Sequence, residues 1–154
     1  MIYSRIKYGS IITGQTTNEN INKIQTLQNK LLKVIYYKNY QYPTNKLHSE
    51  LSILKFNDLI NQETLSFVYE YVHDKLPIVF NNYFTHRHNL TEMIEEQRKR
   101  RFIFPKCDTE IGKSSIIYVG SKLFNEKAPL LKFNISIKTF RNHVKKLYMV
   151  YPEG

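Results

Sequence analysis

The clearest periodic pattern in the chain lies in residues 18–37, NENINKIQTLQNKLLKVIYY. Its aliphatic residues recur at steps of three and four, which places them on one face of an α-helix: Ile21, Ile24, Leu27, Leu31, Val34 and Ile35. Thr17 or Asn18 is a suitable N-cap. We expect a helix of about five turns, with its aliphatic face turned toward a common interior.

Two further helices are predicted in the middle of the chain. Pro43 disfavours helix at Tyr42, and Thr44 can cap a short helix that contains Leu47 and Leu51. A longer helix should begin at Asn57 or Asp58 and end before Pro77. Its expected buried side consists of Leu59, Ile60, Phe67, Val68, Tyr71 and Val72.

The last predicted helix has the sequence SIKTFRNHVKKLYM, and Ser136 is a good N-cap for it. Its apolar stripe, at steps of three, four and three, is Ile137, Phe140, Val144 and Leu147. The basic residues lie off that stripe: Lys138, Arg141, Lys145 and Lys146. Lys145 and Lys146 also suit the negative end of the helix dipole.

The segment YVGSKLFNEKAP, residues 118–129, is interpreted as a short helix that Pro129 ends. Leu123 and Phe124 would fill a pocket formed by the other helices, and the stripe of the last helix would close over them. The predicted fold class is therefore all-α, an irregular helical bundle of four to six helices. An irregular stretch is expected near residues 102–120, where Gly112 lies in a turn-rich connector.

Positive charge is abundant and unevenly distributed. The formal net charge is +10. Residues 1–77 carry nine basic and six acidic side chains, whereas residues 78–154 carry fourteen and seven. Such a surplus attracts polyanions, nucleic acid first and anionic membrane surfaces second. Solubility alone is the competing explanation.

The densest basic cluster is Arg98, Lys99, Arg100 and Arg101. Basic side chains that meet phosphates give salt-sensitive affinity, and Phe102 and Phe104, which follow, have rings that can stack on unpaired bases. A nuclear-import signal or plain surface charge are the alternatives.

The residue types that carry catalysis are scattered. Asp58, Asp74 and Asp108 include no adjacent pair, whereas two-metal nucleotidyl transfer needs neighbouring carboxylates. No glycine-rich phosphate loop is present. Zinc binding by His86, His88 and Cys107, with His73 or His143, has a weak signal because one cysteine stands about twenty residues from the histidines. We therefore predict no catalytic site, no metal and no cofactor in this chain.

The apolar runs are too short for a membrane span, and the N-terminus lacks the apolar core of a signal peptide. One cysteine, Cys107, excludes an intrachain disulfide. We expect a cytoplasmic or nuclear protein without a membrane partner.

A series of short motifs follows one another in a fixed order along the chain. They are SRIKYG at 4–9, IQTLQNKLLKVI at 24–35, Pro43-Thr44, Leu51 with Ile53, Leu54 and Phe56, LPIVF at 76–80, His88 with Asn89 and Thr91, SIIYVGSKLFNEKAP at 115–129, and SIKTFRNHVKKL at 136–147. In this order and spacing they resemble the region downstream of the polymerase palm in reverse transcriptases of non-LTR (LINE-like) retrotransposons. The resemblance runs from about residue 4 to residue 149.

The sequence departs from the family pattern at four places. Thr13 and Phe124 stand where the family has tryptophan, Glu92 replaces a loop arginine, and Ala128 replaces the leucine before Pro129.

The resemblance implies a C-terminal fragment of an RNA-directed DNA polymerase encoded by a transposable element, with the palm carboxylates upstream. It divides the chain into a thumb-like helical remnant at 1–40 and a helical C-terminal region at 41–154, which carries the basic segment 98–101. Its partners would be RNA or RNA–DNA hybrid, bound weakly and without sequence preference, and the upstream polymerase domain.

Nucleic-acid contacts are assigned to Arg98, Lys99, Arg100, Arg101, Arg141, Lys145 and Lys146, and the structural motif to Phe124, Asn125, Pro129 and Phe140. The alternative function is a helical protein-interaction module, or a non-functional relic, whose positive charge is incidental.

Overall fold

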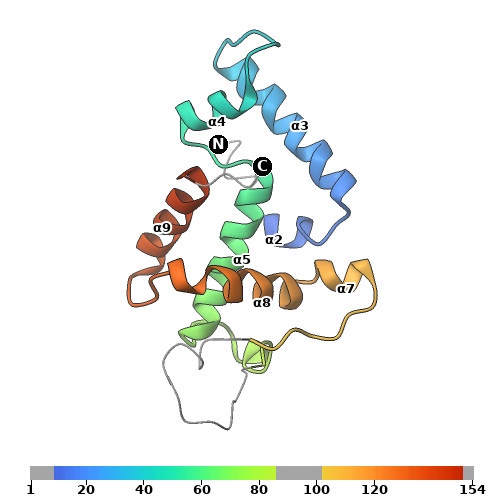
Figure 1. Cartoon of the computed structure of the whole chain (residues 1–154), viewed down its shortest axis with the longest axis vertical. Helices are drawn as coiled ribbons and strands as arrows, with labels where there is room; N and C mark the ends of the chain where they lie inside the picture. Colours follow the sequence, from blue (N-terminus) through green and yellow to red (C-terminus); the bar gives the residue numbers. More distant parts are fainter. Residues whose placement is uncertain (1–8, 86–101, 151–154) are drawn as a thin grey trace.

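The computed structural model describes residues 9–85 and 102–150 (Figure 1). These residues form helices and no β-strand, so the all-α prediction is confirmed. In chain order the elements are α2 (Ser10–Thr13), α3 (Asn18–Ile35), α4 (Thr44–Leu51), α5 (Phe56–Val72), the 3₁₀ helix η1 (Ile78–Phe80), α7 (Glu110–Ser114), α8 (Ile116–Lys127), the 3₁₀ helix η2 (Ala128–Leu130) and α9 (Ile137–Val150).

Helix α5 is the central element of the fold. It runs through the middle of the molecule and is contacted by α2, α3, α8 and α9 (Figure 1). It is therefore buried around most of its circumference, including five polar side chains: Asp58, Gln62, Glu63, Thr64 and Ser66. Sequence periodicity predicted one buried side, because it assumes that a helix has a solvent face. Of that predicted side, Leu59, Ile60 and Val68 are buried, but Val72 is exposed.

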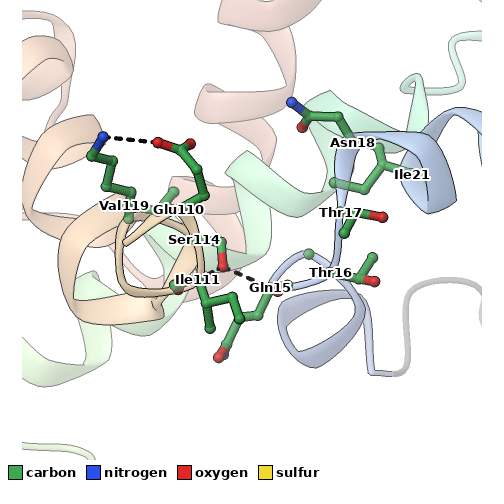
Figure 2. Close-up of a pocket in the computed structure, with 11 residues that line it drawn as sticks. Gln15, Thr16, Thr17, Asn18, Ile21, Glu110, Ile111, Ser114 and Val119 are labelled. Atoms are coloured by element: carbon green, nitrogen blue, oxygen red, sulfur yellow. Dashed lines mark hydrogen bonds and ion pairs between the residues drawn. The ribbon is translucent and has the colours of Figure 1, made fainter. Parts of the chain in front are cut away.

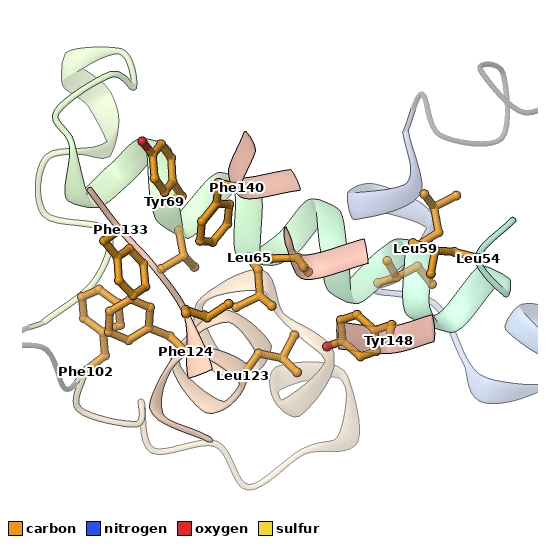
Figure 3. Close-up of a cluster of buried hydrophobic side chains, with 14 of the residues drawn as sticks. Leu54, Leu59, Leu65, Tyr69, Phe102, Leu123, Phe124, Phe133, Phe140 and Tyr148 are labelled. Carbon is orange, nitrogen blue, oxygen red and sulfur yellow. The ribbon is translucent and has the colours of Figure 1, made fainter. Parts of the chain in front are cut away.

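Aromatic rings form the centre of the core where α5, α8 and α9 meet (Figure 3). Phe124 of α8 has its ring centroid 4.7 Å from that of Phe102 and 5.3 Å from that of Phe133. Phe140 of α9 lies 5.7 Å from Phe133 and 4.5 Å from Tyr69 of α5. Rings at these separations and tilts are favourable beyond the apolar area that they bury. This cluster fixes the positions of α8 and α9 on the central helix.

Residues 118–129 have the structure that the sequence predicted. Leu123 and Phe124 lie on α8 and are buried among the other helices, with Phe124 only 1% exposed. Helix α8 ends at Lys127, and Pro129 lies in η2. The non-helical stretch is shorter than the predicted 102–120, because Thr109 and Ser115 are N-caps whose side chains accept backbone hydrogen bonds and start α7 and α8.

Helix α9 packs mainly against α5, and the expectation that its stripe closes over Leu123 and Phe124 stays a prediction. The Ser136 hydroxyl accepts a hydrogen bond from the Thr139 backbone N–H at 3.3 Å, which confirms its N-cap role. Phe140 and Val144 are completely buried, and Ile137 and Leu147 are half-buried. The stripe read from the sequence is thus the side of α9 that faces the core.

The prediction that the aliphatic face of α3 is buried is wrong for most of that face. Ile21 is buried and Ile24 is partly buried against the core, but the rest of the predicted face is exposed to solvent: Leu27, Leu31, Val34 and Ile35. The side that packs inward instead contains Gln28 and Leu32. Gln28 Nε2 donates to the Leu54 carbonyl at 2.9 Å, so a hydrogen bond fixes this side against the rest of the fold.

The residues on either side of segment 86–101 lie next to each other. The Ile103 backbone N–H donates to the Thr85 carbonyl oxygen at 2.8 Å. The rings of Phe84 and Phe102 pack with their centroids 4.9 Å apart. Thr85 and Phe102, where the described part of the chain breaks off and resumes, therefore lie at one place in the fold.

Candidate functional site

Basic side chains dominate the segment from α8 to α9. Residues 116–150 contain one acidic residue, Glu126, and seven basic residues: Lys122, Lys127, Lys132, Lys138, Arg141, Lys145 and Lys146. Lys122, Lys132, Lys138 and Lys146 are exposed, and Lys145 is half-buried. Lys127 lies with its Nζ 5.6 Å from the centre of the Tyr148 ring, within cation–π range. Among the described residues, this segment has the largest excess of basic over acidic side chains along the sequence.

Arg141 has a different environment from the lysines, because it faces acidic groups of α5. Its Nη2 lies 3.6 Å from Glu63 Oε2 and 4.0 Å from Glu70 Oε1. Its Nε donates to Ser66 Oγ at 3.3 Å, and its backbone carbonyl accepts from Gln62 Nε2 at 2.7 Å. These contacts attach α9 to α5. The predicted nucleic-acid role of Arg141 stays a prediction, and the structure adds an intramolecular one.

Sequence reasoning did not find the polar partners of Arg141. Gln62, Glu63, Ser66 and Glu70 follow one another at steps of one, three and four, so they share one side of α5. The signal available in the sequence was a polar stripe with two glutamates along one side of a mostly apolar helix. It pointed to a basic partner on a neighbouring helix.

Arg98, Lys99, Arg100 and Arg101 lie outside the described residues, as do His86 and His88. The structure does show how the chain is held immediately after them. The Asn125 side chain accepts a hydrogen bond from the Phe102 N–H at 3.0 Å and donates one to the Phe102 carbonyl at 2.9 Å. Both backbone groups of Phe102 are thus satisfied by one amide, so α8 fixes the start of the segment that follows the basic cluster.

The assigned structural residues are buried or pack as a group. Phe124 and Phe140 belong to the aromatic core, and Asn125 holds Phe102. Pro129 is itself exposed and lies in η2, where the chain turns after α8. Phe102, proposed as a base-stacking residue, is buried, so its ring packs against protein; Phe104 is about half exposed.

The described histidines use their ring nitrogens in contacts with the protein itself. His48 lies 3.0 Å from the Ile53 carbonyl and 2.8 Å from Asn29 Oδ1. His73 contacts the carbonyls of Tyr69 and Phe133, and His143 that of Leu130. Burial lowers the pKa of His48, an effect that the Ile53 hydrogen bond opposes and the charge of Lys55 reinforces. Within residues 9–85 and 102–150 there is no group of three His, Cys, Asp or Glu that could hold a metal ion.

An open cavity of about 700 Å³ lies where the start of α3 meets α7 (Figure 2). The Ser114 hydroxyl donates to the Gln15 carbonyl at 3.1 Å and joins the two sides. Glu110 and Lys113 form an ion pair at 2.8 Å on the rim, and this hydrogen bond raises the pKa of Lys113. The polar side chains that could meet a ligand here are neutral hydroxyls and amides and one charge pair that is already satisfied, and the rest of the lining includes the aliphatic Ile21, Ile111 and Val119.

Comparison with known proteins returned no match to a family model, to a curated protein or to a solved structure. In the part of the chain that the structure describes, none of the helices combines the length and the apolar character that crossing a bilayer requires.

Proposed function

We propose that this chain binds RNA or RNA–DNA hybrid through phosphate contacts, without sequence preference. In this proposal it is the post-polymerase region of a LINE-like reverse transcriptase. The ordered series of motifs supports the family assignment. The proposed role is to hold nucleic acid and brace a polymerase domain, and we expect no polymerisation by this chain alone.

The observation that carries the proposal is the excess of cations from α8 to α9. Within residues 116–150 the six lysines are accompanied by a single acidic residue, Glu126. Lysine ammonium groups bind phosphates as point charges and release condensed counterions, which gives affinity without base readout. Arg141 is excluded from the strongest contacts in this proposal, because Glu63 and Glu70 already offset its charge. Lys145 and Lys146 are the residues expected to contribute most.

The proposal is tested by filter binding of single-stranded RNA at increasing salt concentration. Every lysine–phosphate pair that a variant removes should make the slope of log K against log salt shallower by about 0.7. The double variant Lys145→Glu/Lys146→Glu should therefore bind more weakly and with a shallower slope. The matched control is Lys30→Glu/Lys46→Glu, which changes the net charge equally on the exposed surfaces of α3 and α4. Affinity that is flat between low and moderate salt, or equal weakening in both variants, would contradict the proposal.

Reversing the charge of Arg98, Lys99, Arg100 and Arg101 distinguishes the proposal from the alternative, in which the positive charge has no role in binding. Binding through this cluster predicts a clear loss of RNA affinity when all four become glutamate. The alternative predicts no change in binding. Circular dichroism of the variant checks that its helix content is retained, so that a loss can be ascribed to the missing charges.

A further inference from the structure

Helix α3 carries an aliphatic stripe on the side that faces away from the fold. Leu27 is 58% exposed, Leu31 41% and Val34 73%, and Ile35 beside them is also exposed. Tyr37 and Tyr40, just beyond the end of the helix, extend the apolar surface and are largely exposed as well. A contiguous apolar surface of this kind on a folded domain marks an interaction site.

The spacing of the stripe is that of a coiled-coil seam. Leu27, Leu31 and Val34 are separated by four and three residues, which is the d–a–d spacing of a heptad seam, and Ile24, three residues before Leu27, continues this spacing but packs partly against the core. The helix itself is fixed from behind, because Ile21 and Leu32 are buried and Gln28 is hydrogen-bonded to the Leu54 carbonyl. The stripe is therefore held in place on a rigid support, and its narrow width matches a single helix.

The charged residues beside the stripe indicate what charge a partner helix would need in order to pack against it. Lys23 and Lys30 each precede an a position, so both occupy g positions of the heptad, where charges select the partner. Glu19 is the single acidic residue of α3 and is paired with Lys23 at 2.6 Å. Lys33 is turned away, since its ammonium donates to the Tyr40 carbonyl. Lys30 is therefore the cation beside the stripe that no carboxylate of α3 offsets, and the flank carries a net positive charge.

A second copy of the chain would not complement this flank. In an antiparallel pair the g lysines of the two copies would face each other. In a parallel pair Lys30 would face Ile35 of the other copy, and the residue in register with Lys23 would be Gln28, which is buried against the fold, so no ion pair would form. Both copies also carry a formal charge of +10. The basic flank therefore favours a different chain with acidic residues at the corresponding positions.

We propose that the exposed face of α3, formed by Leu27, Leu31, Val34 and Ile35, docks an amphipathic helix of a partner protein whose apolar seam is flanked by glutamate or aspartate. This surface and its partner are separate from the nucleic-acid contacts proposed for α8 and α9. The face is the side of α3 that the sequence pattern assigns to an interior, and the described residues 9–85 and 102–150 leave it exposed. A docked helix would bury these aliphatic side chains at its interface with α3.

The test uses a synthetic fluorescent peptide of about four heptads, with leucine at a and d and glutamate at e and g. A second peptide has lysine at e and g. Fluorescence polarisation should show that the protein binds the glutamate peptide and not the lysine peptide. The variant Leu27→Ser/Val34→Ser should weaken binding by roughly tenfold or more, whereas Ile12→Ser/Ile111→Ser, which removes two exposed aliphatic groups elsewhere, should not.

Charge exchange gives a second readout that does not depend on lost packing. The variant Lys23→Glu/Lys30→Glu should shift the preference from the glutamate peptide to the lysine peptide. Equal affinity of the two peptides for this variant, or no binding of either peptide to the unaltered protein, would overturn the proposal. The variant Lys145→Glu/Lys146→Glu should retain peptide binding, so a failure of the nucleic-acid proposal would leave this one intact.

Two other occupants of the face would also overturn it. If the protein sediments as a dimer that Leu27→Ser/Val34→Ser dissociates, the occupant is a second copy. If the protein binds vesicles of phosphatidylserine and phosphatidylcholine through the same residues and does not bind the peptide, the occupant is a lipid surface.

Discussion

Asn125 illustrates how a single side chain can fix a long-range connection in this fold. Its amide pairs with both backbone groups of Phe102, which is 23 residues away in the sequence. A buried backbone N–H and C=O without partners would each carry a desolvation cost. The predicted role of Asn125 was structural, and the amide is the group that a backbone pair requires.

Replacing Asn125 with alanine is expected to lower the free energy of unfolding by about 1–3 kcal/mol, because Phe102 loses both hydrogen bonds. Urea denaturation followed by circular dichroism measures the change. Asn142→Ala, an exposed asparagine on α9, is the matched control and should change stability by less than about 0.5 kcal/mol. A similarly small effect for Asn125→Ala would contradict the assigned role.

His48 predicts a dependence of stability on pH. Because burial lowers its pKa in the folded state, the unfolded chain takes up the proton first as the pH falls. The stabilisation is fully present above the ordinary histidine pKa of about 6.5 and is lost as the pH falls through that value toward the folded pKa.

In His48→Gln this contribution to the pH dependence is removed. The difference in unfolding free energy between the two proteins should therefore change between about pH 8 and about pH 5. Urea titrations at a series of pH values measure it. A difference that stays constant over that range would show that the protonation of His48 is not linked to folding.

At the scale of elements, the contact between α5 and α9 combines an aromatic core with a polar edge. Phe140 packs on Tyr69 in the interior, while Arg141 next to it meets Glu63 and Glu70. Glu63 is buried and the Arg141 side chain is 37% exposed, so water weakens the attraction only in part. The polar edge fixes which way α9 is rotated against α5.

Substituting Arg141 by methionine keeps much of the volume and removes the charge that faces Glu63. We expect a loss of about 1–3 kcal/mol, since a buried carboxylate is left without its cation. The second substitution Glu63→Gln should restore part of that loss, because the coupling between two contacting residues is not additive. Thermal unfolding of the single and double variants measures the coupling, and additive effects would contradict the interaction.

Elements with one buried side were predictable from the sequence, and the others were not. The stripe of α9 follows from periodicity, and the burial of Leu123 and Phe124 was expected from the short apolar pair that precedes Pro129. Helix α5 is surrounded by several helices, so apolar and polar residues are buried alike and its periodicity is weak. In α3 the pattern identified an apolar face correctly, but no pattern within one helix states what covers that face.

For the candidate site, the sequence predicted the excess of positive charge but not which side chains are paired or buried. The basic excess of the C-terminal half can be counted from the sequence, but the pairing of Arg141 with Glu63 depends on how α9 crosses α5. The same applies to Phe102, whose ring was a candidate for base stacking and is buried against Phe84 and Phe124. Tertiary packing decides which basic and aromatic side chains remain available to a ligand.

At the scale of the whole molecule, the buried residues form one connected cluster. Ile21 of α3 belongs to the same cluster as Leu123 of α8 and Phe140 of α9. The division into residues 1–40 and 41–154 came from the resemblance and stays a prediction about ancestry. Because the core is continuous, we expect residues 1–40 and residues 41–154 to unfold together.

The connected core predicts that Ile21→Ala lowers the stability of the whole fold by about 2–4 kcal/mol. Thermal unfolding followed by circular dichroism and by tyrosine fluorescence should then shift together, as a single transition, by several degrees. Two transitions, with only one displaced by the substitution, would show that residues 1–40 form a unit of their own. Lys23→Ala, on the exposed surface of α3, serves as the control.

The hydrogen bond between Ile103 and Thr85 has a consequence for how this protein can be altered. Because the two ends of the intervening stretch meet at that bond, the scaffold itself already holds them together. Doubling the length of a flexible insertion at such a junction costs only about 0.6 kcal/mol. Thr85 and Phe102 are therefore suitable junctions for an inserted peptide: the described fold already brings these two positions together, and Phe102 is kept because its ring is buried in the core.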